Sequence, residues 1–163
     1  MVGIHTVKAS GENMDKVSTS VRSRNMSKIR SVNTKPEKYI RLLLFHMGFR
    51  YRISYKGLSG RPDIYLSRYN TAIFVNGCFW HRHENCRYST IPKSNTAFWT
   101  QKFAKNTERD ARVYEALGAE NVKVIVIWEC TIKKMMKDEE YKNQMMEEIT
   151  DAVRGEGREL MEF

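Results

Sequence analysis

Apolar and polar positions change their period several times along the chain, and these changes predict an α/β fold. Residues 34–47 are expected to form a helix, with Thr34 and Glu37 at capping-box spacing and Gly48 as its stop. Residues 49–54 alternate instead, which is the period of a half-buried strand. The apolar face of the helix is made by Tyr39, Ile40, Leu43, Leu44 and Met47.

Four later segments complete the predicted domain. Short strands are expected at residues 63–67 and 71–75, and residues 122–129 have the composition of a strand buried on both faces. Residues 95–120 have the pattern of a long helix. This order predicts a single α/β domain in which helices flank a mixed central sheet.

The end of the chain carries methionines at near-helical spacing within residues 133–157. A packing role is the preferred interpretation, because helical methionines fill cores more often than they bind cofactors. We divide the chain into a polar N-terminal lead (1–18), a main domain that begins with a short basic helix (19–135) and an acidic helical tail (136–163).

Charge is distributed unevenly along this chain of net charge +9. Residues 19–62 carry eleven lysines and arginines against one acid, whereas the chain from Met136 onward carries nine acids and four bases. This favours a polyanionic partner for the N-terminal half, although a solvated basic face would have the same composition. The candidate phosphate-binding residues of the basic helix are Arg22, Arg24, Lys28 and Arg30.

No apolar run has the length of a membrane span, and the N-terminus lacks the apolar stretch of a secretory signal. We therefore expect a soluble, cytoplasmic protein with no membrane partner. Its cysteines should be reduced in that compartment, so metal binding or plain burial are their remaining uses.

Cysteine and histidine spacing indicates a metal site. Cys78, His83 and Cys86 lie close together in a loop, and Cys130 follows a predicted strand. Three thiolates and an imidazole suit a closed tetrahedral zinc site, which has no open position for a catalytic water. The alternative is that Cys130 is an ordinary buried thiol and that the other two cysteines are incidental. Zinc is preferred because two short-range spacings agree with it.

Asp63 and His81 are candidates for chemistry elsewhere. Asp63 follows a Gly-Arg-Pro turn at the start of a strand, where a carboxylate suits a hard cation such as Mg²⁺, but an aspartate there is often only a turn residue. His81 could activate water beside a metal-bound phosphate, although by itself it is more simply a surface histidine.

Phe79 and Trp80 lie in a polar loop with no period that would bury them, and a third aromatic residue, Trp99, follows in AFWTQK. Aromatic side chains in such a position can wedge between base steps of DNA. They can equally form a small satellite core under the loop, and the residues alone favour neither use.

Several strings of residues together resemble the Vsr family of very short patch repair endonucleases. They run in order from about residue 19 to about residue 135, and they are NMSKIRSVNTKPE, FRYR, LSGRPDIYL, AIFVNGCFWHRHENC, FWTQKFAKNTERDARV and VIVIWEC. The resemblance implies a restriction-endonuclease-like fold and a monomeric, nucleoid-associated enzyme. It also implies a nick on the 5′ side of the thymine in T·G mismatches left by deamination of 5-methylcytosine.

The resemblance further implies roles for individual residues. Asp63 matches the acid that binds catalytic Mg²⁺, and Val75 matches a residue that binds the ion through its backbone carbonyl. His81 matches a histidine at the scissile phosphate, and Glu37 an acid associated with activity. The family's structural zinc ligands match Cys78, His83, Cys86 and Cys130, and its DNA wedge matches Phe79, Trp80 and Trp99.

One active-site position departs from the family pattern. Asn76 stands where well-known members carry a second histidine, so any role of this position is absent or reduced to a hydrogen bond. The strand also lacks the Glu-x-Lys of wider nuclease families, which favours a histidine-assisted reaction with Mg²⁺ stabilising the developing charge.

The resulting hypothesis is a Mg²⁺-dependent, zinc-containing endonuclease of mismatched duplex DNA, with other mismatch-repair proteins as further candidate partners. A catalytically silent mismatch-binding module is one alternative, because Asn76 replaces a histidine. A restriction-like nuclease that cuts matched DNA is the other.

Overall fold

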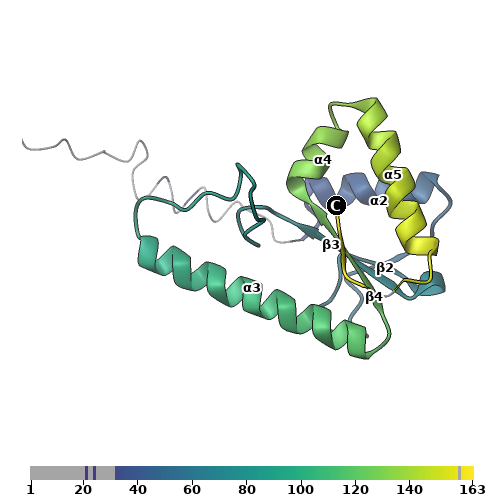
Figure 1. Cartoon of the computed structure of the whole chain (residues 1–163), viewed down its shortest axis with the longest axis horizontal. Helices are drawn as coiled ribbons and strands as arrows, with labels where there is room; N and C mark the ends of the chain where they lie inside the picture. Colours follow the sequence, from purple (N-terminus) through teal and green to yellow (C-terminus); the bar gives the residue numbers. More distant parts are fainter. Residues whose placement is uncertain (1–20, 22–23, 25–31, 158) are drawn as a thin grey trace, which may run out of the picture. The chain divides into compact units, whose positions relative to one another are not determined.

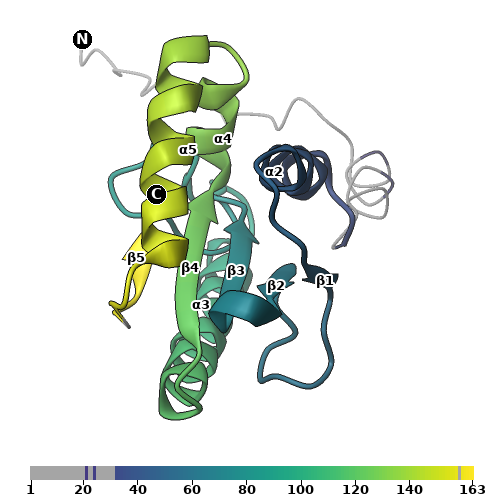
Figure 2. The same cartoon turned by 90° about the vertical axis from the view of Figure 1, so that its right-hand side faces the viewer.

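The centre of the fold is a five-stranded mixed sheet with the order β1-β2-β3-β4-β5 (Figures 1 and 2). The structure is a computed structural model, and it describes residues 21, 24, 32–157 and 159–163. Its strands are β1 (Arg52–Ile53), β2 (Ile64–Leu66), β3 (Thr71–Asn76), β4 (Lys123–Trp128) and β5 (Met161–Glu162). Strands β1 to β3 pair antiparallel, whereas β3, β4 and β5 run parallel. The predicted α/β class with a mixed sheet is confirmed.

Helices cover both faces of this sheet (Figure 1). One face packs against α2 (Lys35–His46), α4 (Glu129–Met135) and α5 (Glu139–Arg154), and the other packs against α3 (Thr96–Ala119). A 3₁₀ turn, η1 (Ser67–Tyr69), joins β2 to β3. Every residue of β4 is buried, including Lys123, as predicted for a strand covered on both faces. The core on the α2 side contains Ile40, Leu44, Ile64, Leu66, Ile73, Ile125, Ile127, Ile132 and Ile149.

Helix α2 begins and ends as predicted. The Glu37 N–H donates to Thr34 Oγ1 over 3.4 Å and the Thr34 N–H donates to Glu37 Oε1 over 3.2 Å, which is the expected capping box. Gly48 follows the helix with a φ of 87°. The inward face of α2 is less apolar than predicted, because Glu37 and Arg41 are buried on it.

The strand predicted at residues 49–54 is shorter in the structure. Phe49 is buried, but only Arg52 and Ile53 pair with β2, and Ile53 is 49% exposed. Ser54 has a φ of 47°, a left-handed conformation that turns the chain away from the sheet. The alternating pattern therefore extends beyond the paired residues.

The end of the chain forms two helices and a strand. Helix α5 buries Met145, Met146, Ile149 and Val153 in the core, as the packing interpretation of the methionines predicted. Strand β5 has no sequence period because it is only two residues long, and it pairs beside β4. None of the helices in the described part of the chain is long and apolar enough to cross a lipid bilayer.

Lys123, the first residue of β4, is buried and caps the end of α5. Its Nζ donates to the carbonyl oxygens of Ala152 over 2.8 Å and of Val153 over 3.1 Å, and also to that of Gly155. The last carbonyls of a helix have no partner within the helix, so this ammonium replaces the missing donors.

Replacing Lys123 with methionine keeps the aliphatic chain but removes these donors. We expect Lys123→Met to lower the free energy of unfolding by about 2–4 kcal/mol, because buried carbonyls lose charged hydrogen-bond partners. Urea unfolding followed by circular dichroism measures this change. Lys38→Met, at an exposed position of α2, is the matched control and should change it by less than about 0.5 kcal/mol. Equal stability of the two variants would contradict the capping role.

Candidate active site

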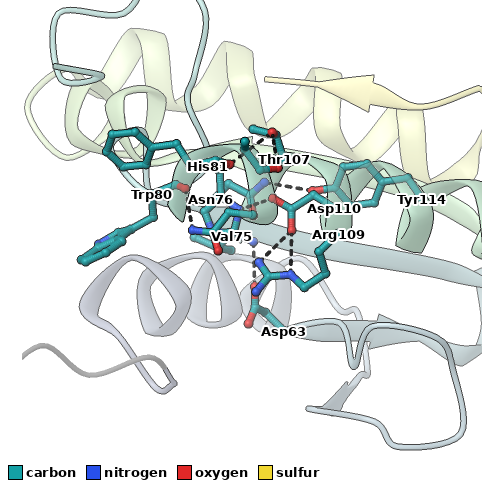
Figure 3. Close-up of polar contacts among 12 residues, drawn as sticks. Asp63, Val75, Asn76, Trp80, His81, Thr107, Arg109, Asp110 and Tyr114 are labelled. Atoms are coloured by element: carbon teal, nitrogen blue, oxygen red, sulfur yellow. Dashed lines mark hydrogen bonds and ion pairs between the residues drawn. The ribbon is translucent and has the colours of Figure 1, made fainter. Parts of the chain in front are cut away.

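The candidate site lies where β2 begins and β3 ends. Asp63 immediately precedes β2, and its Oδ2 accepts a hydrogen bond of 2.8 Å from the N–H of Val75 near the end of β3 (Figure 3). Because the two strands are antiparallel, this bond holds the start of one against the end of the other.

A tight turn before Asp63 positions its carboxylate. Gly60 has a φ of 71°, and a Cβ added there would lie 2.2 Å from Cγ1 of Val113 in α3. Glycine is therefore required both by the backbone conformation and by the close approach of the turn to α3. Arg61, with a φ of 50°, continues the turn.

The electrostatic surroundings of Asp63 favour a bound cation. Burial raises the pKa of Asp63 to about 6, and the negative charge of Glu37 acts in the same direction. The Val75 N–H, Arg41 and His81 lower this pKa but do not compensate for the burial. A divalent cation would stabilise the ionised carboxylate, so the residues here fit a hard metal ion such as Mg²⁺.

Glu37, on α2, is only 3% exposed, and its charge acts on Asp63. Its Oε2 accepts hydrogen bonds of 2.6 Å from Arg41 Nη2 and 2.9 Å from the Asn33 N–H. One carboxylate thus closes the capping box and contributes charge beside Asp63, so its two predicted uses are compatible. Arg41 was not anticipated, although its i+4 spacing from Glu37 was a usable signal.

His81 is oriented by a carboxylate that the sequence did not single out. Its Nδ1 lies 2.5 Å from Asp110 Oδ2, and Asp110 Oδ1 accepts from Arg109 Nη2 over 2.8 Å (Figure 3). Burial by itself would raise the pKa of Asp110, but the hydrogen bonds to His81 and Arg109 lower it below its ordinary value. An ionised Asp110 can accept the N–H of the tautomer protonated on Nδ1, and in that tautomer Nε2 is a hydrogen-bond acceptor. Helical spacing was the signal that could have identified Asp110, since it lies on the same face of α3 as the buried Phe103 and Asn106.

Asn76, the last residue of β3, is 5% exposed and donates to Tyr114 Oη over 2.9 Å. Tyr114 comes from α3, one turn after Asp110. The side chain of Asn76 therefore links β3 to α3. Tyr114, like Asp110, is a partner residue that the sequence analysis did not single out.

Phe79, Trp80 and Trp99 form one aromatic cluster on the first half of α3. The centroid of the Phe79 ring lies 5.1 Å from that of Trp80, 5.3 Å from Trp99 and 5.1 Å from the buried Phe103. The Trp80 carbonyl also accepts a 2.9 Å bond from Asn106 Nδ2. The three residues are half-buried, so the cluster has the packed base of a satellite core and an accessible outer side.

The four predicted metal ligands come together in space. The ligand atoms of Cys78, His83, Cys86 and Cys130 all lie within 4.8 Å of one another. His83 Nδ1 is 3.3 Å from Cys130 Sγ and 3.7 Å from Cys78 Sγ. Tetrahedral zinc with typical bond lengths separates such atoms by roughly 3.6 Å, so this cluster could hold a metal ion. Cys130 follows β4, as predicted, and lies in the first turn of α4.

The chemistry of the donor groups is also that of a metal site. Burial raises the pKa of the Cys78 thiol to about 12, and a bound cation is what would ionise it. Burial lowers the pKa of His83, which favours the neutral imidazole that metals bind. The His83 ring stacks 4.1 Å from Trp128, whose Nε1 donates to Glu162 Oε2 over 2.9 Å. Strand β5 thereby supports the ligand.

Most of the predicted basic helix lies outside the described residues. Arg24 is helical and exposed, whereas Arg22, Lys28 and Arg30 lie outside the described residues. Exposed cations along one flank of α3 were not anticipated as a group. They are Lys102, Lys105, Arg109 and Arg112.

Comparison with known proteins identifies the family. A family model described as "DNA mismatch endonuclease Vsr" matches residues 14–87. The type II nicking enzyme V.NmeAIP of Neisseria meningitidis is 48% identical over 139 residues, which cover 85% of this chain and 99% of that enzyme. The DNA mismatch endonuclease Vsr of Escherichia coli K12 is 35% identical over 140 residues, covering 85% and 86% of the two chains. The chain therefore belongs to the Vsr family of DNA mismatch endonucleases.

Proposed function

We propose that the protein is a Mg²⁺-dependent endonuclease that nicks duplex DNA 5′ of the thymine in a T·G mismatch. As a monomer it would start very short patch repair of deaminated 5-methylcytosine. The observation that carries the proposal is the arrangement of the Asp63 carboxylate beside the paired His81 and Asp110, in a chain similar to the E. coli mismatch endonuclease.

Asp63 and the backbone carbonyl of Val75 are the proposed Mg²⁺ ligands. When bound, the ion supplies Lewis-acid stabilisation of charge at the phosphate. The Val75 N–H fixes one Asp63 oxygen, so the carboxylate enters the reaction already oriented. Glu37 adds negative charge nearby, and its ion pair with Arg41 offsets part of that charge in a buried position.

His81 is the proposed general base. Its Nε2 would take a proton from the attacking water, and Asp110 would stabilise the imidazolium that results. Arg109 holds the second oxygen of Asp110, so the carboxylate is fixed from both sides. This route needs no second acid and lysine on β3, in agreement with the sequence of that strand.

The aromatic cluster is the proposed mismatch sensor. Phe79, Trp80 and Trp99 would insert beside the mismatch, where a T·G wobble costs less to unstack than a paired step. The packing of Phe79 and Trp99 on Phe103 supports the wedge from below. The phosphate contacts that we propose for Arg22, Arg24, Lys28 and Arg30 would make affinity fall steeply with salt.

We infer that the metal of the Cys/His cluster is zinc in a structural role, because four protein ligands fill its coordination sphere. Phe79, Trp80 and His81 lie between the ligands Cys78 and His83. The metal would therefore fix the loop that presents both the wedge and the general base.

A nicking assay on matched and mismatched duplexes tests the function. We expect the protein with Mg²⁺ to nick the thymine strand of a T·G duplex and to leave the same duplex with T·A intact. Labelled strands resolved on a denaturing gel show the position of the cut. Binding without a nick would instead support the silent module, and equal cleavage of both duplexes would support a restriction-like nuclease.

Asp63→Asn tests the catalytic metal site. We expect nicking to fall by on the order of 10²–10³-fold, since a metal Lewis acid contributes several kcal/mol to the reaction. The zinc content should stay unchanged, and it is measured by plasma mass spectrometry on the purified variant. Loss of zinc from Asp63→Asn would show that Asp63 belongs to the other metal site.

The same variant should also change stability with pH. The pKa of Asp63 is raised from its ordinary value of 3.8 to about 6 in the folded protein, so stability falls as pH rises between these two values, where the unfolded chain is ionised and the folded one is not. At pH 8 without Mg²⁺, Asp63→Asn should raise the free energy of unfolding by about 3 kcal/mol, and the gain should shrink toward pH 5. Urea unfolding at both pH values measures it, with Asp151→Asn, exposed on α5, as the control. A gain independent of pH would contradict this account.

Cys130→Ala tests the structural metal. We expect loss of bound zinc and a large loss of stability, because structural zinc contributes on the order of 10 kcal/mol. Metal analysis and thermal unfolding followed by circular dichroism are the measurements. A stable variant that retains a full equivalent of zinc would contradict the assigned ligand set.

A further inference from the structure

Two residues of α3, one helical turn apart, each hold a polar side chain of the site. Asp110 binds His81, and Tyr114 accepts the hydrogen bond from Asn76 (Figure 3). The first pair contains a carboxylate and a titratable ring. The second consists of a carboxamide and a phenol, so it can provide hydrogen bonds but no fixed charge.

Asn76 lies next to the proposed metal ligands. It follows Val75, whose N–H binds Asp63, and in Figure 3 its amide extends from the end of β3 toward Tyr114. Its side chain is nearly buried, which gives the bond to Tyr114 a large influence on how the amide is turned. Phe74 packs 5.2 Å from the Tyr114 ring and limits the movement of the phenol.

A carboxamide can bind Tyr114 in two orientations. In one, Nδ2 donates to the phenol oxygen; in the other, the phenol donates to Oδ1. The second orientation leaves both Nδ2 hydrogens available. Non-bridging phosphate oxygens only accept hydrogen bonds, so a phosphodiester in the site would favour this orientation. Burial raises the pKa of Tyr114, so the phenol keeps the proton that it would donate.

We propose that Asn76 donates a hydrogen bond from Nδ2 to a non-bridging oxygen of the scissile phosphate, and that Tyr114 is the positioning residue that turns the amide for this contact. The inference rests on the proposed nicking activity and deepens it. No proton is transferred in this step. The contact strengthens as charge grows on the phosphate oxygens, so it should affect kcat more than KM.

Phosphorothioate substrates test the contact directly. Sulfur replaces one non-bridging oxygen at the scissile position of a T·G duplex, in either diastereomer, and weakens a hydrogen bond to that position. One diastereomer is expected to report metal binding, recognised by recovery of its rate with Mn²⁺. We expect the other to be slowed by roughly 10-fold without such recovery, as for loss of one donor to a developing oxyanion.

Asn76→Ala should remove this second thio effect. The variant should nick the unmodified substrate roughly 10–100-fold more slowly, with KM changed less than about threefold. Its response to sulfur at the Mn²⁺-insensitive position should then shrink to near unity, because no donor remains there. A residue that only joined β3 to α3 would leave both thio effects at their wild-type size.

Tyr114→Phe is the second variant, and it keeps the ring that packs on Phe74. We expect kcat to fall roughly 3–10-fold and the same thio effect to shrink, while the double variant is no slower than Asn76→Ala alone, because the two residues act as one unit. Tyr65→Phe is the matched control. Tyr65 Oη donates to Asn70 Oδ1 over 2.8 Å, a similar Tyr–Asn pair that takes no part in the site, so kcat should stay unchanged.

The outcomes separate this inference from the function on which it rests. If the wild-type protein does not nick the unmodified T·G duplex, both are overturned. If it nicks and the Mn²⁺-insensitive thio effect persists in Tyr114→Phe and in any folded Asn76→Ala protein, only the contact is overturned. Additive losses in the double variant would likewise overturn the positioning role of Tyr114.

Discussion

The parallel pairing of β3 with β4 is the constraint on which the rest of the site depends. Its register places Asn76 opposite Trp128. Cys78 and Cys130, each two residues further along, therefore follow the carboxyl ends of two neighbouring strands. This pairing brings together metal-cluster ligands that are far apart in the sequence. The fully buried β4, apolar from Val124 to Trp128, fixes this register, because any slip would expose part of the strand.

The site concentrates negative charge in a buried place, which opposes folding. Asp63 has a raised pKa, and Glu37 beside it is almost fully buried. Arg41 forms an ion pair with Glu37, and its positive charge does not compensate for the burial of Asp63. Such an imbalance destabilises a fold and at the same time makes a good cation site, so the same carboxylates serve binding at the expense of stability.

Helix α3 joins the separate parts of the site. Its first half carries Trp99 and Phe103 of the aromatic cluster, and its second half carries Asp110 and Tyr114, which hold His81 and Asn76. A helix keeps such side chains at fixed spacing and so transmits the position of one part to the next. The proposed wedge and the proposed general base are thereby supported by one rigid element.

Local sequence determined the features whose causes lie within a few residues: the capping box at Thr34, the buried strand β4 and the spacing of Cys78, His83 and Cys86. It did not reveal Asp110 or Tyr114, because a polar residue on a helix has no local sign of the strand or loop that it will meet. The early end of β1 was decided by the turn at Ser54, and the pairing of β5 by an edge of β4 more than thirty residues away. Contacts between distant segments depend on how the whole chain packs, and only the tertiary structure decided them.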